Sequence, residues 1–171
     1  KQLCHKYNDI FFEDEAAAKK IIDELLQAEH NDGYCVFTPS FWCDYGFNIK
    51  VGKNFYSNHN LVILDCAEVR FGDNVFIGPN CGFYTAIHPI DAGQRKMEIE
   101  WAKPIKVGND VWFGGSVTVL PGVTIGDNVV IGAGSVVVKD IPSGVVAVGN
   151  PCKPIRKITE ADKLNLNDPN V

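Results

Sequence analysis

The stretch "IKVGNDVWFGGSVTVLPGVTIGDNVVIGAGSVVV", residues 105–138, repeats one pattern every six residues. Large apolar residues occupy one phase of the pattern: Val107, Phe113, Val119, Ile125, Ile131 and Val137. Small or β-branched residues follow four positions later, at Val111, Val117, Val123, Val129 and Ser135. This step matches neither the period of an α-helix, about 3.6 residues, nor that of a single strand, about two. It predicts a parallel β-helix of short strands and turns, with the apolar residues inside.

The same phase occurs earlier in the chain, at Phe71, Ile77 and Phe83, and the gap of 24 residues from Phe83 to Val107 is a whole number of repeats. Glycine follows most of these apolar residues, and we expect it to adopt turn conformations that other residues tolerate poorly. An ordinary β-sandwich with glycine turns would not keep such a constant period. A polar, charged segment at residues 84–103 interrupts the repeat. Its length predicts a functional loop that projects from the coil, and His88 lies at the base of this loop.

Three parts of the chain follow from this pattern: a helical segment over 1–34, a β-helix over 35–150 and a tail over 151–171. Residues 13–29 predict the only convincing helix, because apolar residues recur there at helical spacing. The apolar stripe consists of Ala17, Ile21, Leu25 and Ala28, widened by Ile22 and Leu26. The sequence "HNDG" at 30–33 predicts the end of this helix. The last dozen residues predict a short helix and a loose end.

Composition excludes several classes of protein. The chain has 171 residues, a net charge of −5 and a pI of about 5.3, which argues against nucleic-acid binding. No apolar run approaches the roughly 20 residues of a membrane helix, so we expect no membrane partner. The amino end lacks an apolar signal-type stretch, and the six cysteines form no CxxC pair. We therefore expect a cytoplasmic protein with reduced thiols.

Several longer motifs resemble one known family. "YSNHNL" at 56–61, "IHPID" at 87–91 and "NPCKPIR" at 150–156, together with the repeats, resemble the maltose and galactoside O-acetyltransferases. The resemblance covers residues 2–158. It implies a left-handed parallel β-helix, a homotrimer with active sites between subunits, and transfer of an acetyl group from acetyl-CoA to a sugar hydroxyl. Nothing in the sequence requires a metal.

The resemblance also implies an acceptor side of the active site. The catalytic histidine of the family falls on His88, and a neutral imidazole suits a general base for a hydroxyl group. Acceptor-binding positions fall on Asn58, Asp44 and, directly or beside it, Asp65. An orienting partner for the imidazole would come from Glu98, Glu100 or a backbone carbonyl, and Glu100 is our choice. The family's N-terminal helix, which carries a further acceptor aspartate, begins before the first residue of this chain, so we expect that part of the site to be missing.

The acetyl-CoA side is implied in the same way. The matching positions are Trp112 for the cofactor, Gly115 and Ala133 for its pantetheine arm, and Lys139, Lys153 and Arg156 for its phosphates. Some galactoside enzymes have a serine where this chain has Gly115, so here only a backbone N–H would serve the thioester.

Other functions fit these motifs less well. A γ-type carbonic anhydrase also uses a β-helix but needs three zinc-binding histidines, and the repeat region offers only His59 and His88. A coenzyme A-dependent enzyme with another acceptor, such as serine, an antibiotic or an amino-sugar, stays open. A non-enzymatic β-helix subunit stays open as well, although the set of His88, Asn58 and Trp112 argues against it.

Overall fold

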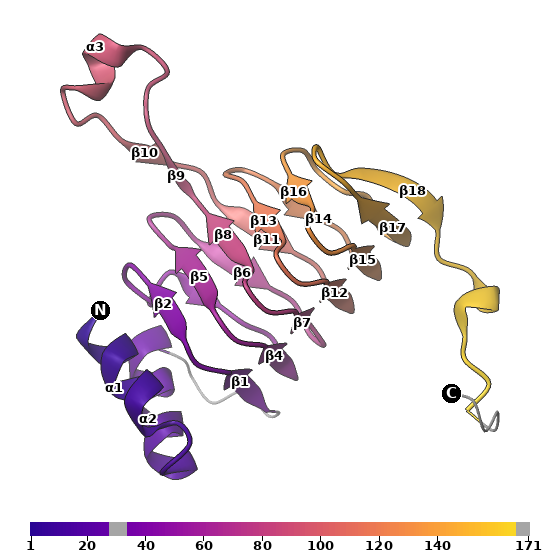
Figure 1. The fold of residues 1–171 in the computed structure, drawn as a ribbon, viewed down its shortest axis with the longest axis horizontal. Helices are drawn as coiled ribbons and strands as arrows, with labels where there is room; N and C mark the ends of the chain where they lie inside the picture. The colour runs from indigo at the N-terminus through magenta and orange to yellow at the C-terminus, as the bar shows by residue number, and fades with distance from the viewer. Residues whose placement is uncertain (28–33, 167–171) are drawn as a thin grey trace.

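The structure is a computed structural model that describes residues 1–27 and 34–166. The chain winds into a solenoid whose successive coils add parallel strands to three sheets (Figure 1). Phe113 pairs with Ile131, and Val119 pairs with Val137, so each residue meets the one three hexapeptides further along the chain. The hexapeptide β-helix predicted from the sequence is confirmed.

Each sheet collects one side of every coil. Sheet A consists of β1 (Cys35–Phe37), β4 (Phe55–Ser57), β7 (Phe76–Ile77), β12 (Val111–Phe113), β15 (Val129–Ile131), β17 (Val145–Val148) and β18 (Lys153–Lys157). Sheet B consists of β2 (Phe41–Cys43), β5 (Leu61–Leu64), β8 (Gly82–Tyr84), β13 (Thr118–Val119) and β16 (Val136–Val137). Sheet C consists of β3 (Ile49–Lys50), β6 (Val69–Phe71), β11 (Ile105–Val107) and β14 (Thr124–Ile125).

The core runs along the inside of the coil. All nine apolar residues of the repeat phase are buried, and none is more than 4% exposed. Most residues four positions later are buried with them, namely Val75, Cys81, Val111, Val117, Val123, Val129 and Ser135, whereas Ile87 at the base of the arm is half-buried. Aromatic rings extend the column toward the N-terminal end, where Phe55 and Phe71 lie 5.2 Å apart and Phe71 and Phe83 lie 5.0 Å apart. Burial of this kind is the main force that stabilises the coil.

The repeat glycines serve a different purpose from the one expected. None of the glycines directly after the phase residues has a positive φ angle; asparagines such as Asn74 and Asn80, at φ 56° and 60°, take that conformation instead. A Cβ on Gly72 would lie 2.7 Å from the backbone of Gly108 in the next coil. These glycines are therefore needed because neighbouring coils approach each other closely.

Two helices cover the N-terminal end of the coil (Figure 1). The predicted helix is α2 (Glu15–Leu26), which begins where the Asp14 side chain accepts a hydrogen bond from the Ala17 N–H. Its buried face is Ala18, Ile22, Leu25 and Leu26, rotated from the stripe through Ala17 and Ile21 that the sequence favoured. Ala28 and the predicted helix end at 30–33 lie outside the described residues.

The other helix, α1 (Gln2–Ile10), was not predicted. Its sequence contains few apolar residues, and contacts with the coil hold it in place. The Tyr7 hydroxyl donates to the Phe37 carbonyl at 2.8 Å, and the Asn8 side chain bonds both backbone groups of Phe41. Tertiary contacts of this kind outweigh a weak helical pattern.

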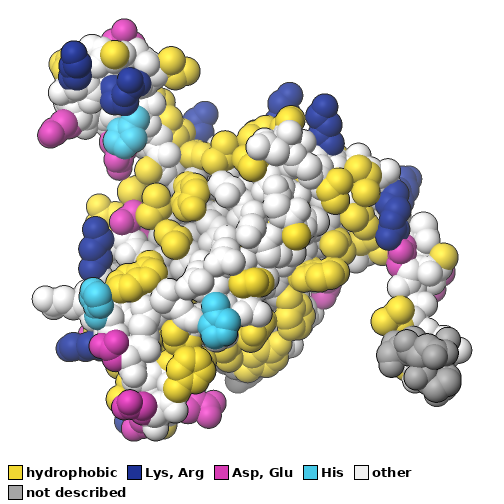
Figure 2. Space-filling view, viewed as in Figure 1, with side chains coloured by type: hydrophobic (Ala, Val, Ile, Leu, Met, Phe, Trp, Pro, Cys, Tyr) yellow, Lys and Arg dark blue, Asp and Glu magenta, His cyan; other side chains and the backbone are white. Residues whose placement is uncertain are grey.

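The segment between β8 and β11 forms a projecting arm (Figure 1). Strands β9 (Ala86–Ile87) and β10 (Trp101–Ala102) pair antiparallel at its base, and helix α3 (Ala92–Arg95) lies near its tip. Acidic, basic and histidine side chains gather on this arm (Figure 2). At the other end of the chain, β18 pairs antiparallel with β17, followed by a short 3-10 helix, η1 (Glu160–Asp162).

Candidate functional site

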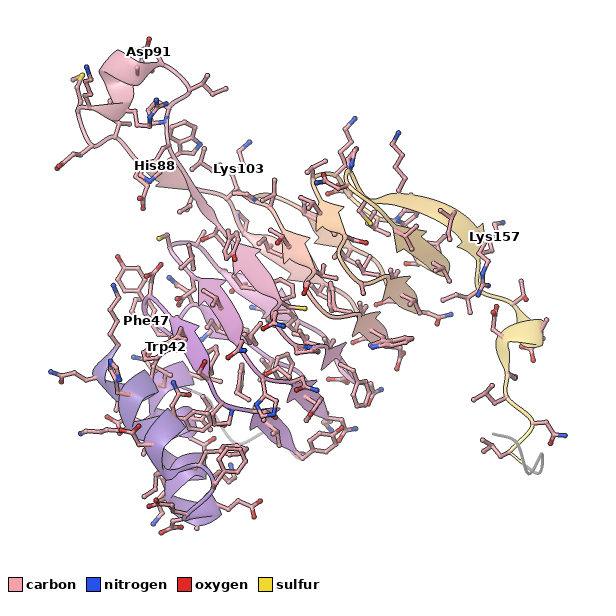
Figure 3. All side chains as sticks on the ribbon, viewed as in Figure 1. Trp42, Phe47, His88, Asp91, Lys103 and Lys157 are labelled. Carbon is pink, nitrogen blue, oxygen red and sulfur yellow. The ribbon has the colours of Figure 1, made fainter. Side chains whose placement is uncertain are left out.

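His88 follows β9 directly, so the base of the arm fixes its position (Figure 3). Its Nδ1 lies 3.3 Å from the Ile99 carbonyl oxygen, and its Nε2 lies 3.2 Å from Glu100 Oε2. Both partners come from the returning limb of the arm. A carbonyl oxygen can only accept a hydrogen bond, so the contact with Ile99 favours the tautomer with its proton on Nδ1. The Glu100 carboxylate is an acceptor too, so Nε2 faces it with a proton in the imidazolium and with a lone pair in the neutral ring protonated on Nδ1.

A pocket of about 400 Å³ opens beside His88. Its lining consists of Lys1, Asp44, Tyr45, Leu64, Cys66, Ala86, His88 and Glu100. The structure thus brings together three of the residues that the sequence placed in the active site: His88, Glu100 and Asp44. The His88 and Glu100 side chains are 54% and 43% exposed, so both are accessible to a ligand.

Cys66 lies between the two carboxylates of this pocket. Its Sγ is 3.7 Å from Asp44 Oδ2 and 3.6 Å from Glu100 Oε1. Loss of solvent, followed by the negative charges of Asp44 and Glu100, raises the pKa of the Cys66 thiol to about 11. The thiol therefore stays protonated and acts as a weak donor toward the carboxylates. Neither Cys66 nor Tyr45 was singled out from the sequence.

Asp65, where the resemblance placed an acceptor position directly or beside it, does not line this pocket. It is fully buried, and its carboxylate accepts hydrogen bonds from the backbone N–H groups of Asp44, Tyr45 and Gly46 at 3.0, 2.9 and 2.7 Å. Its role is to hold the turn that presents Asp44 and Tyr45. The residue beside it, Cys66, is the one that lines the pocket.

A second group of predicted residues lies along another corner of the coil, where the chain passes from sheet A to sheet B. Asn58 is in the connection between β4 and β5, Gly115 between β12 and β13, and Ala133 between β15 and β16. Backbone hydrogen bonds stack these connections: Ser116 N–H to the Pro79 carbonyl at 2.7 Å, and Gly134 N–H to the Gly115 carbonyl at 2.9 Å. They form one column parallel to the coil axis.

Gly115 differs from its neighbour in this column. The Gly114 N–H donates to the Ile131 carbonyl at 2.8 Å, whereas the Gly115 N–H has no hydrogen-bond partner within residues 1–27 and 34–166. A Cβ on Gly114 would lie 2.6 Å from the Ala133 nitrogen, but a Cβ on Gly115 would lie 3.3 Å from its nearest neighbour. Gly114 is therefore required by the coil, whereas Gly115 is less crowded and carries an N–H donor that the described residues leave unbonded.

Sheet A carries three more of the predicted cofactor residues: Trp112 in β12, and Lys153 and Arg156 in β18. Strand register places Trp112, Val130, Val146 and Arg156 in one row across the sheet. Trp112 is 56% exposed. Lys153 begins β18 in register with Val148, near the end of the column of connections. Basic side chains gather at this C-terminal end of the coil (Figure 2).

Arg156 already has an anionic partner. Its Nη1 and Nη2 lie 2.9 and 2.7 Å from the two oxygens of Asp162. The Arg156 guanidinium lowers the pKa of the Asp162 carboxyl to about 2, so the pair stays ionised. Lys139 lies elsewhere: it follows β16 at the corner where sheet B passes to sheet C, the same corner that carries the arm.

The predicted residues therefore form two separate groups in one chain. His88, Glu100 and Asp44 meet at the pocket beside the arm, while Asn58, Gly115 and Ala133 lie at the corner between sheet A and sheet B.

Within the described part of the chain, no cluster of three or more His, Cys, Asp or Glu side chains is arranged to hold a metal ion. No helix among those residues has the length and apolar character of a membrane span.

Comparison with known proteins identifies the family. A family model described as bacterial transferase hexapeptide (six repeats) matches residues 104–139. A Saccharomyces cerevisiae protein named as an acetyltransferase is 55% identical over 167 residues, which cover 98% of this chain and 84% of that protein. This chain belongs to the family of hexapeptide-repeat acetyltransferases that contains the maltose and galactoside enzymes. It is an acetyltransferase.

Solved structures of such acetyltransferases have the same fold. A maltose O-acetyltransferase from Clostridium difficile 630 is 46% identical, with a TM-score of 0.87 over 93% of this chain and 84% of that one. A galactoside acetyltransferase in complex with coenzyme A is 40% identical, with a TM-score of 0.90 over 98% of this chain and 83% of that one. The galactoside acetyltransferase, a structural neighbour of this chain, therefore binds coenzyme A.

Proposed function

We propose that this acetyltransferase moves the acetyl group of acetyl-CoA to a hydroxyl group of a sugar, with His88 as the general base. The observation that carries the proposal is the pairing of the His88 imidazole with the Ile99 carbonyl and the Glu100 carboxylate. The Ile99 carbonyl holds the proton on Nδ1, so that Nε2 accepts the hydroxyl proton as the oxygen attacks the thioester carbon. Glu100 then stabilises the imidazolium that forms. The proton passes to the departing coenzyme A thiolate.

The pocket beside His88 suits a polyhydroxy acceptor. Asp44 and Glu100 supply carboxylate oxygens that accept hydrogen bonds from hydroxyl groups, and Leu64 and Ala86 supply apolar surface. Pockets that combine apolar walls with a few placed polar groups are typical of small-molecule sites. We assign acceptor binding to Asp44, and also to Asn58, whose amide can donate and accept. We leave Asp65 out of the acceptor contacts.

Gly115 is our candidate for stabilising the attacked carbonyl. Negative charge develops on the thioester oxygen as the hydroxyl attacks, and a backbone N–H aimed at this oxygen lowers the barrier. The Gly115 N–H has no other partner within the described ranges, and the glycine leaves room for a slender pantetheine arm. We assign the remaining acetyl-CoA contacts to Trp112 and Ala133, and the phosphate contacts to Lys139, Lys153 and Arg156.

These assignments require more than one chain. The column with Gly115 and the arm with His88 occupy different corners of the same coil, so one subunit supplies only half of each site. We propose a closed homotrimer in which the arm of one chain lies over the Gly115 column of the next. Exposed apolar residues on the arm support this arrangement, since Ile90 is 98% exposed and Met97 71% exposed in the single chain.

The test is release of coenzyme A thiol from acetyl-CoA in the presence of maltose, glucose or a galactoside, with serine as the non-sugar control. The expected result is sugar-dependent release together with an O-acetylated sugar identified by mass spectrometry. His88→Ala should lower the rate by about 10²–10⁴-fold, the usual contribution of a general base. Release that needs no sugar, or that survives the substitution, contradicts the proposal.

A further inference from the structure

Two buried cysteines meet where helix α1 packs against strand β2 (Figure 1). Cys4 is 0% exposed and Cys43 is 4% exposed, and their sulfur atoms lie 3.6 Å apart. The two residues are 39 positions apart in the chain. All six cysteines are free thiols, and this is the only hydrogen bond between two sulfur atoms within residues 1–27 and 34–166.

Neighbouring contacts hold the two sulfur atoms opposite each other. Next to Cys4, the His5 ring meets the Trp42 indole with ring centroids 4.7 Å apart. One turn further along α1, the Asn8 side chain bonds the N–H and the carbonyl of Phe41 at 2.9 and 3.1 Å. Helix α1 cannot slide along β2 without breaking these contacts, so the two thiols stay in register.

A disulfide needs only a small movement from this position. Bonded sulfur atoms lie about 2.05 Å apart, so the two thiols must approach by roughly 1.5 Å. Rotation of the side chains and a slight shift of α1 supply this movement. The nine-residue helix is attached to the coil by few polar bonds, so its local opening admits a small oxidant to the thiols.

The contact also makes the two thiols chemically different. The hydrogen bond from the Cys43 thiol lowers the pKa of the Cys4 thiol, although burial acts in the opposite direction. The same bond, followed by burial, raises the pKa of the Cys43 thiol, so Cys43 keeps its proton. Because the thiolate is the form that attacks an oxidant, Cys4 is the sulfur that reacts first.

We propose that Cys4 and Cys43 form a reversible disulfide when the protein meets a peroxide, and that this bond fastens α1 to the coil. The Cys4 thiolate attacks one peroxide oxygen, the O–O bond breaks, and hydroxide leaves Cys4 as a sulfenic acid. The Cys43 sulfur then attacks the Cys4 sulfur, the S–O bond breaks, and water leaves. The hydroxide takes up the proton that Cys4 released, so two thiols are oxidised and one peroxide becomes two waters.

The disulfide is reversed by thiol exchange, for which a small dithiol such as dithiothreitol is sufficient. The inference does not depend on the acceptor of the acetyl group. Loss of the proposed acetyl transfer would leave it intact, because no residue of the pocket beside His88 takes part in the oxidation.

The experiment treats the full chain with hydrogen peroxide and digests it, without reduction, with trypsin and chymotrypsin. Trypsin leaves Cys35 and Cys43 in one peptide, and chymotrypsin separates them by cleavage after Phe37 and Phe41. Mass spectrometry should show a peptide pair linked through Cys4 and Cys43 that dithiothreitol splits. The unfolding temperature should rise by roughly 5–10 °C on oxidation, as for a cross-link that closes a loop of this length.

Two variants complete the test. Cys43→Ala, or Cys4→Ala if the first does not fold, should form no link, and peroxide should not raise its unfolding temperature. Cys35→Ala is the matched control, because burial raises the pKa of the Cys35 thiol to about 12, and it should behave as the wild type does. Absence of a linked peptide in the wild type, linkage of Cys4 to another cysteine, or a Cys4–Cys43 link with an unchanged unfolding temperature would each overturn the inference.

Discussion

His88 and Glu100 meet across the base of the projecting arm, with Nε2 3.2 Å from the Glu100 carboxylate. The two residues lie on opposite limbs of the arm, and the pairing of β9 with β10 sets the distance between them. When the imidazole carries its single proton on Nδ1, Nε2 and the Glu100 carboxylate are both proton acceptors. A hydroxyl group that enters the pocket therefore meets two acceptors, and the proton it donates to Nε2 creates an ion pair.

Glu100→Gln tests this relationship. The amide keeps the size of the side chain but removes the charge that stabilises the imidazolium. We expect kcat to fall by about tenfold, at the low end for a hydrogen bond to a charged group because the pair is partly exposed, with KM for acetyl-CoA unchanged. Steady-state thiol release measures both values. Glu98→Gln on the same arm is the control and should retain wild-type activity; equal effects of the two substitutions would contradict a specific role for Glu100.

Asp65→Asn tests the turn that carries Asp44 and Tyr45. The asparagine places one amide group, a donor, against backbone N–H groups that now donate to a carboxylate. We expect the free energy of unfolding to fall by about 2 kcal/mol, as for the loss of charge-assisted hydrogen bonds. Urea denaturation measures this change.

The same variant should also raise KM for the acceptor more than KM for acetyl-CoA, because the displaced turn contributes Asp44 and Tyr45 to the pocket of His88. An unfolding free energy equal to that of the wild type, with both KM values unchanged, would show that Asp65 does not position this turn.

The neighbouring glycines Gly114 and Gly115 offer a matched pair. Gly114→Ala places a Cβ against the backbone of Ala133, and such overpacking should destabilise the fold by roughly 1–3 kcal/mol. Gly115→Ala places its Cβ 3.3 Å from the Pro79 carbonyl oxygen, a milder contact, and should destabilise the fold less than Gly114→Ala. Its methyl group would instead occupy the path of the pantetheine arm and raise KM for acetyl-CoA by about tenfold. Thermal unfolding and kinetics separate the two effects; unchanged KM in Gly115→Ala would remove Gly115 from the site.

The Cys66 thiol provides a prediction about pH. A pKa raised to about 11 disfavours the thiolate, so the thiolate appears only as the pH rises toward 11. At pH 8, alkylation of Cys66 by iodoacetamide should be about a hundredfold slower than that of an ordinary exposed cysteine. Glu100→Gln removes one of the nearby negative charges and should speed the reaction. Mass spectrometry of the Cys66 peptide follows the rate, and a pH dependence like that of a free thiol, unaffected by Glu100→Gln, would contradict the assignment.

The repeat pattern was sufficient to predict the coil, because each phase residue such as Phe83 or Phe113 is buried by the same local geometry. It was insufficient for α1, whose position depends on bonds from Tyr7 and Asn8 to strands more than twenty residues away. It also gave the wrong reason for the repeat glycines, since close approach between coils depends on neighbours that one repeat does not reveal.

The candidate site was predicted in the same uneven way. The His-Pro sequence drew attention to His88. Glu100, our choice of orienting partner, contacts Nε2, whereas the Ile99 carbonyl, an example of the backbone alternative, contacts the other ring nitrogen. Asp65 and Cys66 are adjacent in sequence, but the Asp65 side chain is buried in the fold and the Cys66 side chain lines the pocket. The alternation of side chains along β5 carried that signal: Leu61 and Ile63 are buried, which places Asp65 on the inner face and Cys66 on the outer.

Joint action of His88 from one chain and Gly115 from the next is the central claim, and subunit mixing tests it most directly. His88→Ala and Gly115→Val are each expected to be inactive but folded by circular dichroism. The two variants are unfolded together in equal amounts, refolded and assayed for sugar-dependent thiol release. Random assembly should restore about a quarter of wild-type activity, because each intact half comes from a different chain with a chance of about one half. Activity no higher than that of the separate variants would place both residues in sites built from a single chain.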